Sequence, residues 1–99
     1  MKQIKQMAEE IRAELEDAEH YAKTAAREKE TDRTLSGVYA KLAEQELGHA
    51  NILHEQAQRL IRESGEEAPE SMKVIWDWEH ERMLDRESKV RVMLEMLRS

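Results

Sequence analysis

Apolar side chains recur at spacings of three and four residues along most of the chain, which is the period of an amphipathic α-helix. The pattern breaks twice, around Thr31 and again at the stretch Gly65-Glu66-Glu67-Ala68-Pro69. Glycine commonly ends a helix, and proline fits the first turn of the next one because it has no N–H to leave unpaired. The pattern therefore predicts three helices, at about residues 3–30, 32–64 and 69–98.

Each predicted helix has an apolar seam that a few polar residues interrupt. The seam of the first helix is Met7, Ile11, Glu14, Ala18, Tyr21 and Ala25. The seam of the second helix is Leu35, Tyr39, Leu42, Glu46, His49, Leu53, Gln56 and Leu60, and that of the third is Trp76, His80, Met83, Glu87, Val90, Leu94 and Leu97. An alternative stripe on the first helix is wholly apolar and would leave Glu14 at the rim of the core; it is Ala8, Ile11, Leu15, Ala18, Ala22 and Ala25.

These elements predict one all-α domain over residues 1–99. The short connection between the first two helices favours an antiparallel hairpin, to which the third helix is a C-terminal addition. The chain has no Phe and 38% charged residues, which suits long surface helices better than a sheet. A domain of this size buries only about 60 to 65% of the surface of its unfolded chain, so we expect a partner subunit.

The net charge and the absent residue types exclude some classes of function. A formal net charge of −6 leaves no basic stripe for phosphate groups, so nucleic acid is not an expected partner. No apolar run approaches the roughly 18 residues that cross a bilayer, and the first residues lack the apolar core of a signal peptide. We therefore expect a cytoplasmic protein without a membrane partner, either free or inside a protein compartment. Because Cys is absent, a metal can bind only carboxylates and imidazoles here.

The polar interruptions of the first two seams are side chains that commonly bind metals. Glu46 and His49 are three residues apart and lie on one face of a helix, and Glu14 is expected to face them from the antiparallel neighbour. A carboxylate buried in an apolar bundle needs a partner or a cation. Glu and His ligands suit iron, manganese or zinc, and several carboxylates favour iron and manganese. The three residues would form half of the di-iron carboxylate set of helical bundles.

The pattern Glu14-x6-Tyr21 followed by Glu46-x-x-His49 resembles the first half of the ferroxidase-centre signature shared by ferritins and rubrerythrins of the ferritin-like superfamily. It is most similar to encapsulated ferritins, short proteins that hold only this one hairpin, and the resemblance covers about residues 10–62. The resemblance implies that Glu14, Glu46 and His49 are iron ligands and catalytic residues. It also implies that Glu46 bridges two irons and that Tyr21 lies just outside the ligands.

The same resemblance implies a homo-oligomer, a dimer or a multiple of dimers, in which two hairpins complete a four-helix bundle. Each subunit then contributes half of a di-iron centre that oxidises Fe(II) with dioxygen or peroxide, for iron storage or detoxification. A shell of the encapsulin type would be a further partner. The tail at residues 92–99 shows no extended, Gly-containing docking peptide, so the sequence does not support this partner.

Two other interpretations stay open. A rubrerythrin-like peroxidase uses the same ligands but needs a reductant, whereas a metal-free helical scaffold would use the seam acids for ion pairs at an oligomer interface. On the third helix, His80 and Glu87 are separated by about 10.5 Å of rise, so one ion cannot easily bind both from the same chain. For these two residues a structural role and an additional metal site are both open.

Overall fold

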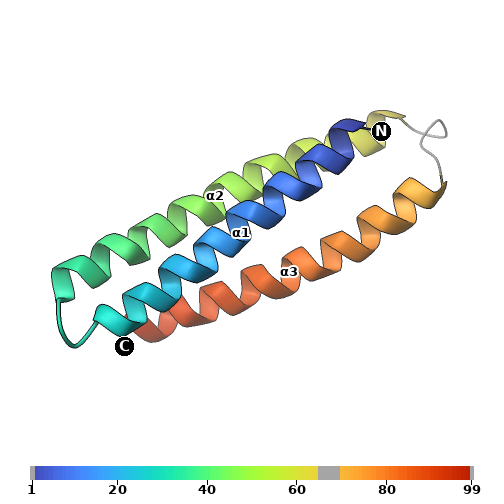
Figure 1. Cartoon of the computed structure of the whole chain (residues 1–99). Helices are drawn as coiled ribbons and strands as arrows, with labels where there is room; N and C mark the ends of the chain where they lie inside the picture. Colours follow the sequence, from blue (N-terminus) through green and yellow to red (C-terminus); the bar gives the residue numbers. More distant parts are fainter. Residues whose placement is uncertain (1, 65–69, 99) are drawn as a thin grey trace.

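The computed structural model describes residues 2–64 and 70–98, apart from the side chains of residues 71 and 72. These residues form three α-helices, which are α1 Lys2–Glu28, α2 Arg33–Ser64 and α3 Glu70–Arg98 (Figure 1). The all-α prediction is confirmed, and the helix boundaries fall within two residues of those predicted. The capping roles expected of Gly65 and Pro69 lie outside the described residues.

The turn between α1 and α2 is closed by local hydrogen bonds. Asp32 caps α2, because its carboxylate accepts a hydrogen bond from the Leu35 N–H at 3.0 Å. Deeper in the hairpin, the buried Ser36 hydroxyl donates to the Ala25 carbonyl at 2.7 Å and links the last turn of α1 to the first turn of α2. The two helices therefore leave the turn side by side as an antiparallel hairpin (Figure 1).

The core lies along the wholly apolar stripe of α1. Its residues on α1 are Ile4, Ala8, Ile11, Leu15, Ala18, Ala22 and Ala25, and those on α2 are Ala43, Leu47, Ala50 and Ala57. The third helix contributes Trp76, Met83, Val90 and Leu94, which confirms the apolar positions predicted for its seam.

The predicted seams of α1 and α2 differ from this core in one respect. Glu14 and Tyr21 on α1 and Glu46 on α2 are only half-buried, and His49 is exposed. The prediction that they lie inside the seam is corrected here, because both helices turn a neighbouring stripe of mostly apolar side chains toward the core. Burying apolar side chains is favourable, whereas burying carboxylates without partners is costly, so the apolar stripes face the core. The seam acids therefore lie along the rim of the hairpin.

α3 packs against α1, on the side that carries Arg12, Glu16 and Glu19. Arg12 binds Glu79 at 2.7 Å, and Lys89 binds Glu19 at 3.2 Å. A hydrogen bond from Lys23, with a further one from Lys89, lowers the pKa of Glu19. In Figure 1 α1 runs between α2 and α3, and the molecule measures 54 × 17 × 16 Å along its principal axes. None of the described helices is long and apolar enough to cross a membrane.

Candidate metal centre

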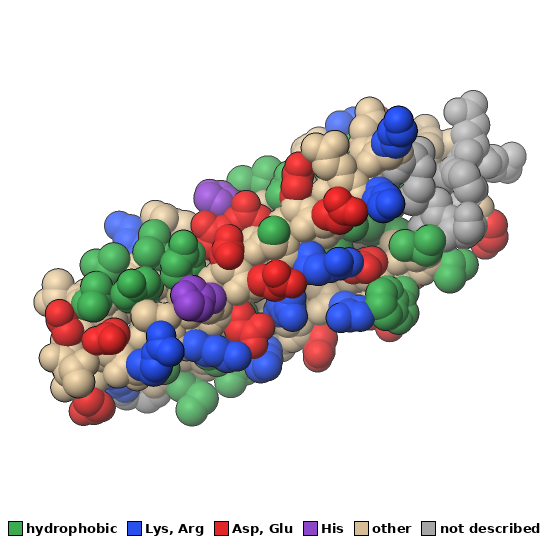
Figure 2. Space-filling model, viewed as in Figure 1, with side chains coloured by type: hydrophobic (Ala, Val, Ile, Leu, Met, Phe, Trp, Pro, Cys, Tyr) green, Lys and Arg blue, Asp and Glu red, His purple; other side chains and the backbone are tan. Residues whose placement is uncertain are grey.

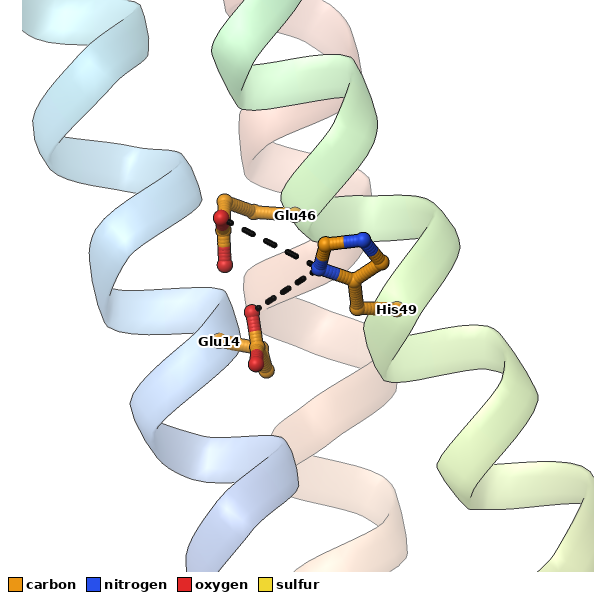
Figure 3. Close-up of side chains that lie close together, drawn as sticks. All are labelled: Glu14, Glu46 and His49. Atoms are coloured by element: carbon orange, nitrogen blue, oxygen red, sulfur yellow. Dashed lines mark ion pairs between the residues drawn. The ribbon is translucent and has the colours of Figure 1, made fainter.

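Glu14 on α1 meets Glu46 and His49 on α2 near the middle of the hairpin (Figure 3). Glu46 and His49 project from consecutive turns of one helix, and the antiparallel course of α1 brings Glu14 to the same level. Each side chain offers one ligand-type atom, and these atoms all lie within 4.8 Å of one another. The structure therefore brings together the three residues that the sequence singled out.

Distances at the cluster are close to those that a shared cation requires. The Nδ1 atom of His49 lies 3.5 Å from Oε2 of Glu14 and 3.9 Å from Oε1 of Glu46. Two atoms that bind one ion at about 2.0 to 2.2 Å stand about 3 to 3.5 Å apart in tetrahedral or octahedral geometry. Neither contact is short enough to be a good hydrogen bond. Small side-chain movements would place all three atoms around one ion.

One oxygen of the cluster, the Glu14 Oε2 atom that His49 Nδ1 approaches at 3.5 Å, makes no hydrogen bond within the described residues. Oε2 of Glu14 is buried and has no hydrogen-bond donor among the described residues. The two carboxylates are partly shielded, with 29% of the Glu14 side chain and 19% of the Glu46 side chain exposed, whereas His49 is 58% exposed. A buried oxygen without a donor is costly in a metal-free protein, and a cation would compensate it. The donor set of two carboxylates and one imidazole fits iron, manganese or zinc.

The same geometry also suits a simpler arrangement. A protonated His49 would form ion pairs with Glu14 and Glu46, across N–O distances of 3.5 and 3.9 Å. Exposed pairs of this kind contribute little to stability, about 0 to 1 kcal/mol.

The cluster lies on a face of the hairpin that α3 leaves uncovered. α3 packs on the opposite flank of α1, and Figure 3 shows its ribbon behind the two hairpin helices. We call the uncovered side the open face and define it by the cluster together with Met7, Tyr21, Tyr39, Leu42, Leu53 and Leu60, all half-buried. In Figure 2 hydrophobic side chains gather over the turn end of the hairpin, next to acidic side chains and a histidine. The half-buried apolar residues of the open face share the hairpin helices with the cluster.

Tyr21 lies on this face but not within the cluster. Its ring is 6.1 Å from that of Tyr39 and 5.9 Å from that of His20, measured between centroids. Tyr21 is two helical turns from Glu14, or about 10.5 Å of rise. The position beside the ligands that the resemblance implies for Tyr21 stays a prediction.

His80 and Glu87 lie elsewhere, between α3 and the α2 side that faces it. The His80 ring is 4.5 Å from the ring of His54, and Glu87 binds Arg91 at 2.7 Å. His54 was not among the candidate site residues predicted from the sequence. The signal was present, because His54 continues the alternating spacing of Ala43, Leu47, Ala50 and Ala57, which is the stripe that α2 buries.

Comparisons of the chain with protein-family models, with curated proteins and with solved structures gave no match. The likeness to the ferritin-like superfamily therefore rests on the motif residues and on the hairpin that brings them together.

Proposed function

We propose that the protein is an iron-binding, ferritin-like subunit, and that two chains meet at the open face to build a di-iron ferroxidase centre. The observation that carries this proposal is the cluster of Glu14, Glu46 and His49, with its potential ligand atoms within 4.8 Å and one buried oxygen without a donor. Manganese or zinc would compete for the same ligands, since both accept carboxylate and imidazole.

The ligand count supports a site shared between chains. Three side chains leave an iron ion, which commonly takes five or six ligands, incompletely coordinated. Di-iron bundle proteins use one Glu from each of two helices and Glu-x-x-His from each of the other two. One copy of this chain supplies half of that set, so a second copy related by two-fold symmetry supplies the other half.

The open face suits this partner. Its half-buried apolar residues surround the cluster, and among them Leu42 is not packed against the core. A single 99-residue chain with a thin core gains from burying such residues against a second hairpin. A second copy accounts for both the missing ligands and the apolar surface around them.

The chemistry follows from the ligand types. Each Fe(II) gives up one electron, so a pair reduces one dioxygen to hydrogen peroxide with two protons, or one hydrogen peroxide to two waters with two protons. The carboxylates of Glu14 and Glu46 would hold the iron and offset its growing positive charge, and His49 would add an imidazole nitrogen that fixes its position. An open dimer has no cavity for mineral, so the oxidised iron would pass to a shell, a partner or solution.

Anaerobic equilibrium dialysis against Fe(II) tests this proposal. Wild type is expected to bind about one iron per chain, and Glu46→Gln is expected to lose it while keeping the helical circular dichroism. Glu9→Gln is the matched control, because it removes an exposed carboxylate of α1 outside the cluster. Equal iron binding by wild type and Glu46→Gln would contradict the proposal.

A metal-free scaffold is the second candidate, and the ion-pair geometry of His49 with Glu14 favours it. The dialysis experiment separates the two, because a scaffold binds no iron in a Glu46-dependent manner. If iron does bind, oxygen consumption without an added reductant indicates a ferroxidase. Peroxide turnover that requires a reductant indicates the rubrerythrin-like peroxidase.

A further inference from the structure

α3 carries apolar side chains on two opposite faces. One face contributes Trp76, Met83, Val90 and Leu94 to the core. The other face points to solvent, and the apolar residues exposed there are Val74 (61%), Trp78 (55%), Val92 (56%) and Met96 (67%). These four positions share one side of a helix with 3.6 residues per turn. A surface helix usually carries polar residues opposite its core face, so the second apolar face indicates a second contact.

The residues along this outer face are ordered symmetrically about Asp85. We call them the outer stripe, and they are Val74, Trp78, Glu81, Asp85, Lys89, Val92 and Met96, all exposed. The apolar residues lie at both ends of the stripe and the charged residues in its middle, and Figure 2 shows hydrophobic side chains near both ends of α3. Two α3 helices packed antiparallel about Asp85 would place these pairs opposite each other: Val74 with Met96, Trp78 with Val92, and Glu81 with Lys89. The stripe is therefore complementary to a second copy of itself.

The charges in the middle of the stripe favour this antiparallel arrangement. Glu81 makes no ion pair within the described residues, and the Lys89 side chain is 63% exposed although its Nζ lies 3.2 Å from Glu19. Antiparallel packing brings Glu81 of each copy to Lys89 of the other, whereas parallel packing would oppose like charges, which is costly.

One repulsive contact remains at the centre of the antiparallel pair, where Asp85 faces its own copy. Arg82 lies one turn before Asp85 on the flank of the stripe, and its guanidinium carbon is 4.6 Å from the centroid of the Trp78 ring. From there Arg82 of one copy is in reach of Asp85 of the other and offsets the repulsion between the two carboxylates.

We propose that the outer stripe of α3 is an interface with a second copy of this chain, in which two α3 helices pack antiparallel about a two-fold axis at Asp85. The contact uses residues of α3 alone and needs no iron. A chain can therefore bind one copy here and another through the open face. Two different two-fold contacts on one chain join dimers into larger assemblies.

The contact between two isolated chains is weak, because the stripe is one helix wide and its middle is charged. Interfaces of this small size belong to transient complexes. We expect monomers at low micromolar concentration and paired chains at about 1 mM. Where the open face already joins chains, several such contacts act together and the pairing is stronger.

Sedimentation equilibrium of Glu46→Gln in the presence of a chelator tests this proposal, because this background lacks the iron site. The weight-average mass is expected to rise toward that of two chains between about 10 µM and about 1 mM. Adding Glu81→Lys is expected to weaken the association by at least about 10-fold, since it replaces two ion pairs by two repulsive contacts. Glu9→Lys is the matched control, because it makes the same change of charge at an exposed position of α1.

Disulfide formation tests the antiparallel arrangement directly, since the chain has no cysteine of its own. In the same background, Asp85→Cys is expected to form a disulfide-linked pair on mild oxidation, because position 85 lies on the two-fold axis. Val74→Cys is the control, because its two copies would lie about 33 Å apart along the paired helices. Circular dichroism checks that each variant keeps its helices.

The proposal is overturned if the background stays monomeric up to about 1 mM, or if Glu81→Lys associates as strongly as Glu9→Lys. It is also overturned if Val74→Cys cross-links as readily as Asp85→Cys. Because the background binds no iron at the cluster, none of these results bears on the ferroxidase proposal.

Discussion

Glu14 has the most costly environment among the candidate ligands. Its Oε2 atom is buried without a donor, and its carboxylate lies beside that of Glu46. Both features destabilise the metal-free protein, and functional sites often carry such a cost. Substitution of Glu14 therefore tests whether the cluster binds a cation.

Replacing Glu14 by Gln is expected to stabilise the metal-free protein by about 1 kcal/mol, because an amide removes the repulsion and donates to Glu46. For a domain of this size, that change raises the thermal midpoint by about 4 to 8 °C. Differential scanning calorimetry in the presence of a chelator measures the thermal midpoint of the metal-free protein. Added Mn²⁺ should raise the midpoint of wild type and leave Glu14→Gln unchanged. A lower midpoint for the metal-free variant would show that Glu14 stabilises the fold by itself.

The lowered pKa of His54 predicts a pH effect on stability. The unfolded chain takes up a proton at the ordinary pKa of about 6.5, while the folded chain does so only at lower pH. Stability conferred by a neutral His54 is therefore present above about pH 6.5 and is lost as the pH falls from there toward the folded pKa. Urea midpoints at pH 7 and pH 5 should differ more for wild type than for His54→Gln. An equal difference in both proteins would refute this origin of the pH effect.

The helices themselves could be predicted well from the sequence, because their period and their punctuation are local. Three helices and the hairpin are confirmed. Which stripe faces inward was harder to predict, because two adjacent stripes on α1 have nearly the same spacing. Which stripe of α1 faces the core depends on where α3 packs, and that position is a property of the tertiary structure. For the same reason, the meeting of His54 with His80 was not predicted.

The Asp32 cap of α2 is expected to contribute to the stability of the protein. Asp32→Ala removes the acceptor for the Leu35 N–H and is expected to lower the free energy of unfolding by about 1 kcal/mol. Chemical denaturation measures this loss. Thr34→Ala is a suitable control, since it changes an exposed residue in the same turn. Unchanged stability in Asp32→Ala would mean that water replaces the cap without cost.

The proposed dimer depends on the open face of the hairpin. It combines the cluster with apolar residues on the side that α3 leaves uncovered, so a second hairpin can complete both the ligand set and the bundle. The motif predicted the three residues that the structure brings together as candidate ligands, but no local pattern specifies a partner chain. The dimer therefore remains a proposal that the geometry of the face supports.

Leu42→Glu is expected to prevent iron-driven assembly while leaving the monomer folded. Leu42 is half-buried on the open face and is not packed against the core, so a carboxylate there meets its counterpart only in the dimer. Val92→Glu is the control, because Val92 is 56% exposed on α3. Light scattering in the presence of anaerobic Fe(II) should show monomers for Leu42→Glu and dimers for Val92→Glu. Dimers in both variants would place the interface elsewhere.

The central claim is that two chains share a di-iron centre, and native mass spectrometry during an anaerobic Fe(II) titration tests it most directly. The account predicts that a species of two chains with two iron ions appears as iron is added, and that Glu46→Gln does not form it. A monomer that binds iron without dimerising, or a dimer that forms equally in Glu46→Gln, would contradict the claim.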